Sequence, residues 1–173
     1  MKVTSLKFSD VKLIEPEVFE DERGFFYESF NQQKFNQALG QEIIFVQDNH
    51  SKSTKGVLRG FHYQEEPFGQ GKLVRVIVGE VYDVVVDIRK NSPTFGQWVS
   101  QILSADNKKQ IWIPQGFAHG FLTLSDNSEF LYKLTQFYSK QHEKIIPYNH
   151  KDFNVSWPEL NTQLILSQKD NIV

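Results

Sequence analysis

The clearest alternation of apolar and polar positions lies in the middle of the chain. Every second residue from Lys72 to Val78 falls on one face of an extended segment, and after a turn at Gly79 the same holds from Tyr82 to Ile88. A period of two is typical of β-strands. The pattern therefore predicts two consecutive strands, and it places Lys72 on the same face as three valines.

Shorter stretches of this kind flank these strands and are separated by Gly and Pro turns. Residues 31–40 differ, because Asn31 can cap a helix, Phe35 and Leu39 share a face, and Gly40 can end it. Further strands are predicted within residues 1–30 around a turn at 21–24, and within 42–51, 56–64, 98–105, 111–125 and 130–138.

Many short strands with one helix, and no regular alternation of the two, predict an all-β fold, a β-sandwich or jelly roll. The aromatic content of 14%, with fifteen Phe, fits packed sheets. The 173 residues suit one domain, residues 1–173, with a sizeable core.

Composition narrows the function classes. A formal net charge of −2 offers no general attraction to nucleic acid or to anionic lipid. No apolar run approaches the ~18 residues of a membrane span, so we expect no membrane partner and a cytoplasmic location. The absence of Cys excludes disulfides, thiol nucleophiles and thiolate metal sites.

Two residues on the strands suggest chemistry. His62 is a proton acceptor and Lys72 a positive charge, and together they suit removal of a proton from carbon beside a ketone. The alternative for Lys72 is an edge residue whose ammonium reaches solvent. Gln47, Asn49 and Ser51 share one side of a strand and suit hydrogen bonds to a sugar or base, or else form a polar strand end.

A metal site is the competing interpretation of the histidines. His62 with His119 and a carboxylate could supply ligands, but Gln64 stands where a second histidine of an HxH motif would lie. We therefore expect no metal.

Eight motifs together point to one family. They are DERGFFYESF (21–30), QDNHS (47–51), GVLRGFHYQ (56–64), QGKLVRV (70–76), VDIRKNSPTFGQW (86–98), IWIPQGFAHGFLTLS (111–125), FLYKLTQFY (130–138) and SQKD (167–170). With these motifs, which span roughly residues 20–170, the chain resembles the dTDP-4-dehydrorhamnose 3,5-epimerases, a family of cupin-like jelly rolls.

The resemblance implies a substrate and four catalytic roles. The substrate is dTDP-4-keto-6-deoxy-D-glucose, whose C3 and C5 hydrogens are acidified by the C4 ketone, and no metal or other cofactor is needed. His62 matches the base, Asp170 its carboxylate partner, Lys72 the stabiliser of the C4 oxygen and Tyr132 the acid on the opposite face.

Further positions match the family's substrate contacts. Tyr138 matches a residue that stacks on thymine, and Arg23, Arg59 and Lys169 match residues near the diphosphate. The other matched contacts are Glu28, Gln47, Asn49, His119 and Glu143. The family also implies a homodimer whose N-terminal region, with Arg23 and Glu28, crosses to the neighbour.

Two local features depart from a simple match. Arg59 and His62 have opposite parity on a regular strand, so both can face one site only with a bulge at Gly60 or a role at the strand end. In residues 145–158, relatives commonly carry an acidic Asp-Asp-Pro turn where this chain has Asn149, His150 and Lys151.

Two alternative functions stay open. One is a related enzyme that inverts only C3 or C5, or moves the keto group. The other is a jelly roll that binds a sugar nucleotide without catalysis, for which His62 and Tyr132 would be unnecessary.

Overall fold

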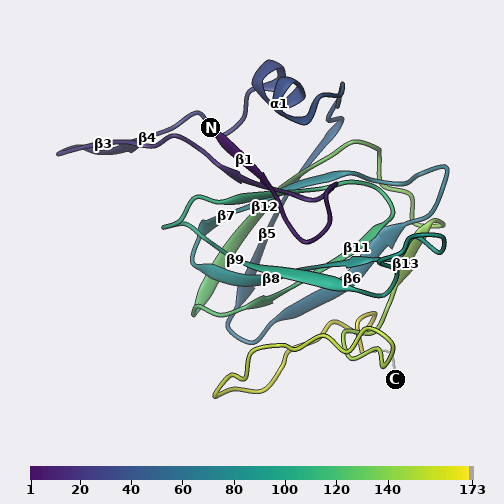
Figure 1. Cartoon of the computed structure of the whole chain (residues 1–173). Coiled ribbons are helices and arrows are strands. Elements are labelled where there is room, and N and C mark those ends of the chain that lie inside the picture. Colours follow the sequence, from purple (N-terminus) through teal and green to yellow (C-terminus); the bar gives the residue numbers. More distant parts are fainter. Residues whose placement is uncertain (172–173) are drawn as a thin grey trace.

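The computed structural model describes residues 1–171, which form two antiparallel sheets packed face to face with a short helix and a projecting hairpin (Figure 1). The six-stranded sheet has the spatial order β1 (Lys2–Ser5), β2 (Lys12–Glu15), β10 (Gln110–Ile113), β7 (Lys72–Val78), β12 (Asn127–Leu134), β5 (Gln47–Thr54). The five-stranded sheet has the order β13 (Glu143–Ile145), β6 (Leu58–Gln64), β11 (Phe117–Thr123), β8 (Glu80–Asp87), β9 (Trp98–Ser104). The prediction of an all-β jelly roll is confirmed.

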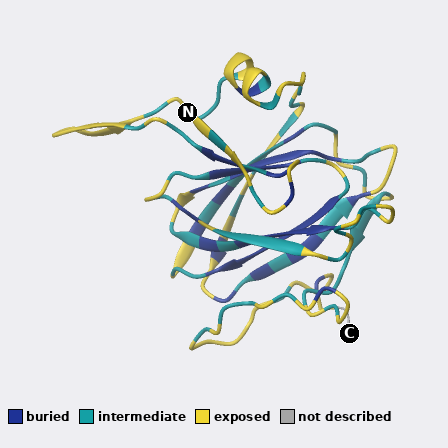
Figure 2. Ribbon diagram, in the orientation of Figure 1, coloured by how far each residue is buried: buried dark blue, intermediate teal, exposed yellow. Residues whose placement is uncertain are grey.

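The main core lies between the sheets, where alternate residues of each strand meet (Figure 2). Val74, Val76 and Phe130 of the six-stranded sheet pack against Val81 and Val85 of the other. The predicted period of two in β7 and β8 is thereby confirmed.

The other face of the five-stranded sheet is covered by the C-terminal segment. Tyr82, Val84 and Val86 of β8 contact this side and pack with Phe153 and Trp157. Both faces of β8 are therefore buried, and its odd-numbered residues point into the sandwich. This parity directs Asp83 inward with Val81 and Val85.

The helix α1 (Gln32–Leu39) forms as its residues predict. The Asn31 side chain accepts a hydrogen bond from the backbone N–H of Lys34, and Gly40 ends the helix with a φ of 68°. Phe35 packs on Trp112, so α1 covers the outer face of the six-stranded sheet. Within residues 1–171, no helix is long and apolar enough to span a membrane.

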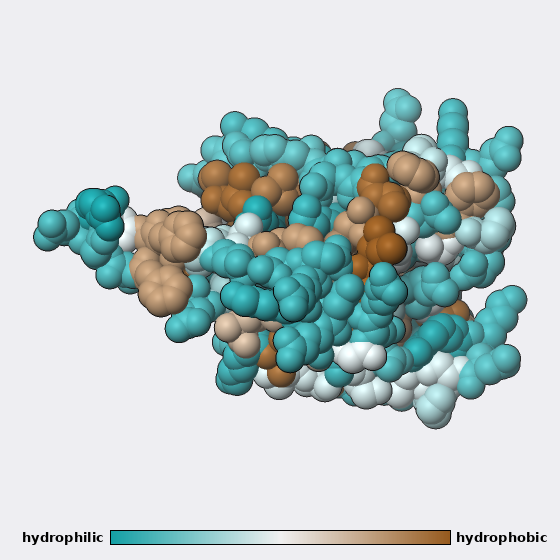
Figure 3. Space-filling model, turned by 90° about the horizontal axis from the view of Figure 1, so that it is seen from above, coloured by the Kyte–Doolittle hydropathy of each residue, from teal (hydrophilic) through white to brown (hydrophobic). Residues whose placement is uncertain are grey.

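The hairpin of β3 (Phe19–Asp21) and β4 (Gly24–Phe26) projects away from both sheets, at the left of Figure 1. Phe19, Phe25 and Phe26 are 58%, 60% and 71% exposed. Figure 3 shows these aromatic side chains gathered along the projection. We call Phe19–Phe26 the arm.

Candidate active site

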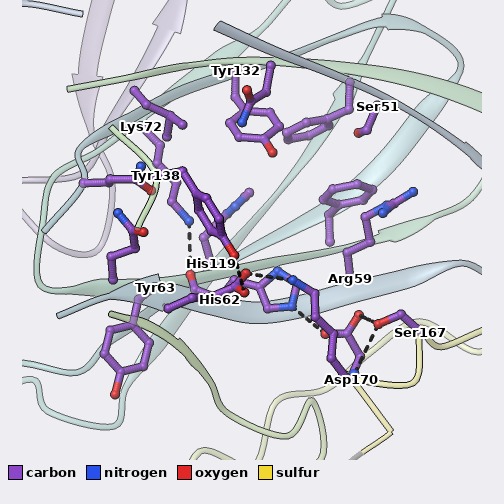
Figure 4. Close-up of a pocket in the computed structure, with 18 residues that line it drawn as sticks. Ser51, Arg59, His62, Tyr63, Lys72, His119, Tyr132, Tyr138, Ser167 and Asp170 are labelled. Atoms are coloured by element: carbon purple, nitrogen blue, oxygen red, sulfur yellow. Dashed lines mark hydrogen bonds and ion pairs between the residues drawn. The ribbon is translucent and has the colours of Figure 1, made fainter. Parts of the chain in front are cut away.

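A cavity of about 330 Å³ opens between the two sheets and contains most of the residues that the sequence singled out (Figure 4). Its lining comprises Asn49, Ser51, Arg59, His62, Tyr63, Gln64, Gln70, Lys72, His119, Phe121, Phe130, Tyr132, Leu134, Tyr138, Glu143, Ser167, Lys169 and Asp170. The sandwich, whose main core is formed by apolar side chains, therefore also contains a polar site open to solvent.

The side chains of His62 and Asp170 are hydrogen-bonded although 108 residues separate them. His62 Nε2 lies 2.5 Å from Asp170 Oδ1, and the Ser167 hydroxyl donates to Asp170 Oδ2 at 2.7 Å. Burial acts to raise the pKa of Asp170, but the hydrogen bonds from His62 and Ser167 outweigh it and the pKa is lowered. Because an ionised carboxylate only accepts, Nε2 carries a hydrogen and Nδ1 is left as the basic nitrogen of neutral His62.

Asp170 reaches His62 because the C-terminal segment pairs with the start of β6. Ile165 donates its N–H to the Gly56 carbonyl at 2.8 Å and accepts from the N–H of Leu58 at 3.0 Å. Gly56 has a φ of 83°, and a Cβ there would lie 2.6 Å from the Gln163 carbonyl oxygen. Glycine at position 56 therefore lets the segment dock.

Lys72 enters the cavity from a central strand. It is 8% exposed, and its Nζ donates to the backbone carbonyl of His62 at 3.1 Å. Burial lowers the pKa of Lys72 to about 8, although the charges of Asp83 and Glu143 act to raise it. The alternative of a solvent-reaching edge lysine is wrong, because β7 has neighbours on both sides.

Tyr132 lies across the cavity from His62. It belongs to β12 of the six-stranded sheet, whereas His62 belongs to β6 of the five-stranded sheet. Figure 4 shows both side chains at the cavity, with the Tyr132 ring on the side opposite the imidazole. A ligand held between the sheets would have one group on each face.

A bulge in β6 explains how Arg59 and His62 share the cavity. His119 pairs with His62 and Phe121 with Arg59, so β6 uses one more residue than β11 over this distance. Gly60 has a φ of 125°, and a Cβ there would lie 2.6 Å from Gly120 Cα. Of the two explanations that the parity of Arg59 and His62 allows, the bulge at Gly60 is confirmed.

His119 forms a second buried contact that includes a residue the sequence reasoning missed. Its Nε2 lies 2.8 Å from Asp83 Oδ2, and the two side chains are 8% and 0% exposed. Asp83 Oδ1 has no hydrogen-bond partner among the described residues. Alternation could have found Asp83, because it falls on the inward face with Val81 and Val85.

Polar side chains at the cavity's mouth are linked to one another. Glu143 accepts from Lys169 Nζ at 2.7 Å and from the Tyr138 hydroxyl at 3.0 Å. Gln47 is outside the lining but accepts from the Tyr138 N–H at 3.0 Å and donates to Asn49 at 3.0 Å. The structure thus brings these five predicted contacts together.

Arg23 and Glu28 lie elsewhere. Arg23 is on the arm and pairs with Asp21, while Glu28 pairs with Lys34 beside α1. Neither lines the cavity of its own chain. Residues 145–158, where the sequence predicted a departure from the family, contribute no residue to the lining of the cavity.

The described residues contain no group of three or more His, Cys, Asp or Glu side chains placed to hold a metal. His62 and His119 each contact a separate carboxylate instead.

Comparison with known proteins gives a consistent result. The family model described as dTDP-4-dehydrorhamnose 3,5-epimerase matches residues 5–173. The dTDP-4-dehydrorhamnose 3,5-epimerase of Shigella flexneri is 61% identical over 98% of this chain and 93% of its own.

Solved structures agree in fold. An epimerase from Legionella pneumophila, in complex with dTDP-4-keto-L-rhamnose, has a TM-score of 0.94 and 52% identity over 98% of this chain and 89% of its own. A 3'-monoepimerase from Streptomyces bikiniensis, in complex with dTDP-quinovose, has a TM-score of 0.90 and 32% identity over 96% of this chain and 83% of its own.

Proposed function

The chain belongs to the dTDP-4-dehydrorhamnose 3,5-epimerase family, and from this membership we propose that it inverts C3 and C5 of dTDP-4-keto-6-deoxy-D-glucose to give dTDP-4-keto-L-rhamnose. The enzyme is an isomerase. We place the reaction in the cytoplasm, as the sequence predicts. The chemistry needs a base, a group that stabilises an enolate and an acid, and the residues around the cavity supply all three.

His62 is the proposed base. The neutral imidazole removes the proton from C3 or C5, each of which lies beside the C4 ketone. Asp170 fixes the ring and stabilises the imidazolium that forms, because its carboxylate is buried against Nε2. Its lowered pKa keeps this carboxylate ionised at neutral pH.

Lys72 is the proposed stabiliser of the enolate. When the proton leaves carbon, negative charge develops on the C4 oxygen, where a fixed cation lowers the barrier most. A pKa of about 8 keeps the ammonium mostly protonated at neutral pH. Burial removes competing water and strengthens the interaction.

Tyr132 is the proposed acid, and its position opposite His62 is the observation that most strongly supports the proposed inversion. Inversion requires the new proton to arrive on the face opposite the one that lost it. The origin of His62 and Tyr132 in opposite sheets supports this arrangement. A base that returned its own proton would exchange hydrogen without inverting the carbon.

The other cavity residues suit the remainder of the ligand. Arg59 and Lys169 supply positive charge for the diphosphate. Tyr138 is 52% exposed at the mouth and offers a ring for stacking on thymine. Gln47, Asn49, His119 and Glu143 complete the proposed substrate contacts.

The test is incubation with dTDP-4-keto-6-deoxyglucose in D2O, without added metal or nicotinamide, followed by NMR at both carbons. We expect deuterium at C3 and at C5. Exchange at C3 alone would support the second candidate, a 3'-monoepimerase, which the similarity to the Streptomyces bikiniensis enzyme favours. Movement of the keto group to C3 would indicate a ketoisomerase. Tight binding of dTDP without exchange would indicate a binding protein.

The arm supports a homodimer. Its three Phe side chains are 58%, 60% and 71% exposed, although the Phe25 ring contacts Tyr27 and the Lys108 ammonium, and a second copy would bury them. In such a dimer Arg23 and Glu28 would reach the neighbour's substrate site. Light scattering at micromolar concentration should give the mass of two chains, and a monomer would contradict the proposal.

A further inference from the structure

Gln64 lines the cavity, but its side chain is bonded to the main chain. It ends β6 and is 7% exposed. Its Nε2 donates to the carbonyls of Phe68 at 2.9 Å and Phe137 at 3.3 Å, and its Oε1 accepts from the N–H of Ser139 at 2.6 Å. Both amide hydrogens are thereby used, so Gln64 has no donor left for a ligand. It instead joins the loop after β6 to the loop after β12.

The loop after β12, residues 135–142, carries Tyr138, which is proposed to stack on thymine. The Tyr138 ring is exposed at the mouth of the cavity (Figure 4), but the main chain around it is held. Gln64 bonds the residues before and after Tyr138, and Gln47 accepts the N–H of Tyr138 itself at 3.0 Å. Two glutamine side chains therefore fix three consecutive residues of this loop.

The main chain held by Gln64 also places Glu143. The Ser139 carbonyl accepts from the N–H of Glu143 at 3.1 Å, and the Glu143 carboxylate accepts from the Tyr138 hydroxyl at 3.0 Å. The position of Ser139 therefore affects both partners of the hydrogen bond between Tyr138 and Glu143.

The loop after β6, residues 65–71, contacts the loop after β12 directly. The Phe68 ring centroid lies 4.5 Å from that of His142, and the Glu65 N–H donates to the His142 carbonyl at 3.0 Å. The His142 Nδ1 lies 2.7 Å from the Ser139 hydroxyl. The two loops thus form one unit at the mouth, and the buried Gln64 is bonded to both.

We infer that Gln64 is a positioning residue, which holds the Tyr138 ring in place for the thymine of the ligand. This inference rests on the proposed function, which assigns Tyr138 to the thymine. A ring on a loop that is fixed before binding loses less conformational entropy on binding than a ring on a free loop, so the fixed loop binds more tightly. Position 64, where the second histidine of an HxH metal motif would lie, serves the loops at the mouth in this chain.

Calorimetry with dTDP and steady-state kinetics of the epimerisation test the inference. Gln64→Met keeps the length of the side chain and loses all three hydrogen bonds. We expect the Kd for dTDP and the KM to rise about 10-fold and kcat to stay within about 2-fold of the wild-type value. An unchanged Kd would overturn the inference. A lower kcat with an unchanged KM would also overturn it, because the effect of Gln64 would then lie at the reacting groups.

A double-mutant cycle shows whether Gln64 acts through Tyr138. In a Tyr138→Ala background the stacking ring is absent, so the further change Gln64→Met should weaken dTDP binding by about 2-fold or less. An equal loss of affinity in the presence and absence of the ring would show that Gln64 acts independently of Tyr138, and would overturn the inference.

Asn107→Leu is the matched control. The Asn107 amide also makes three hydrogen bonds to the main chain, with the carbonyl of Ile102 at 2.9 Å and the N–H groups of Ser104 at 3.1 Å and Lys109 at 3.0 Å. It lies between β9 and β10, outside the cavity lining. The variant should have a lower free energy of unfolding and the wild-type affinity for dTDP. A loss of affinity equal to that of Gln64→Met would overturn the specific role of Gln64.

The wild-type protein separates this inference from the proposed function. If it binds dTDP and exchanges deuterium, but Gln64→Met binds dTDP equally well, the positioning role is wrong and the epimerase function stands. If the wild-type protein does not bind dTDP, both fail. Should Gln64→Met not fold, amide hydrogen exchange of the wild-type protein still tests the inference. The Ser139 amide should be protected from solvent exchange, and an unprotected amide would show that Gln64 does not hold it.

Discussion

Two His–Asp pairs lie side by side in the five-stranded sheet, yet they differ in access and in how the carboxylate arrives. His62 and His119 are register partners on β6 and β11. The His62 side chain is 24% exposed and its carboxylate comes from the C-terminal segment, whereas His119 is 8% exposed and takes its carboxylate from the adjacent strand β8. The same chemical pair is thus accessible at the proposed base, His62, and buried within the sheet at His119.

The two pairs also differ in the hydrogen bonding of the second carboxylate oxygen. Asp170 Oδ2 accepts from Ser167, while Asp83 Oδ1 has no partner among the described residues and lies near the charge of Lys72. An ionised, satisfied Asp170 can support repeated protonation of His62. Asp83 instead contributes fixed negative charge to the interior of the sandwich.

Removal of the accessible imidazole should have the largest effect. In His62→Asn, deuterium exchange at C3 and C5 should fall by at least ~10²-fold, because the base is gone. dTDP affinity should stay near the wild-type value. The NMR exchange assay measures the loss, and near-normal exchange in a folded, dTDP-binding variant would exclude His62 as the base.

Substitution of the two carboxylates, Asp170 and Asp83, should affect activity in one case and stability in the other. Asp170→Asn should lower the exchange rate by about 10- to 100-fold and the free energy of unfolding by less than about 1 kcal/mol. Asp83→Asn should lower the free energy of unfolding by about 2 kcal/mol, since His119 loses a buried charged acceptor. Urea denaturation measures the free energy of unfolding of each variant, and the NMR assay measures its exchange rate. A larger loss of stability in Asp170→Asn and a larger loss of exchange in Asp83→Asn would contradict the proposed difference between the two pairs.

The charge of Lys72 predicts a pH dependence. Exchange should decline as pH rises through about 8, because the ammonium that stabilises the enolate is lost. The unfolded chain binds more protons than the folded one above that pH, since burial lowers the folded pKa. The contribution of Lys72 to stability therefore increases with pH up to the ordinary lysine pKa. In Lys72→Met, the residual exchange should lack the decline near pH 8, and its persistence would assign that decline to another group.

Displacement of the C-terminal segment should produce the smallest loss. Gly56→Ala pushes a Cβ against the Gln163 carbonyl and moves Asp170 away from His62, so exchange should fall by about 3- to 10-fold. Gly40→Ala is the control, because Gly40 also has a positive φ but a Cβ there would meet no atom within 4 Å. Equal activities of the two variants would show that docking does not depend on Gly56.

Local physics made much of the fold predictable. Alternation identified β7 and β8, and the Asn31 and Gly40 caps identified α1. The opposite parity of Arg59 and His62 pointed to Gly60 as the position of a bulge. These features depend on residues close together in the chain, so their signals are readable in the sequence.

The residues that form the cavity were harder to predict from local sequence patterns. No sequence pattern near either residue predicts the contact between Asp170 and His62, because that contact depends on the pairing of Ile165 with Val57. The contact was predicted from the family resemblance alone. Asp83 was missed because the predicted apolar face of β8 was the even-numbered one, which packs beneath the C-terminal segment. The sequence also offered no sign that Phe121 and Phe130 of the cavity lining would stack on one another.

The opposition of His62 and Tyr132 across the cavity is tested most directly in Tyr132→Phe. NMR in D2O measures exchange and inversion in one sample, and the substitution keeps the ring while removing the proton it would deliver. We predict that inversion falls by at least ~10²-fold while exchange with retention of configuration persists at a measurable rate. Inversion at both C3 and C5 at the wild-type rate would contradict the account.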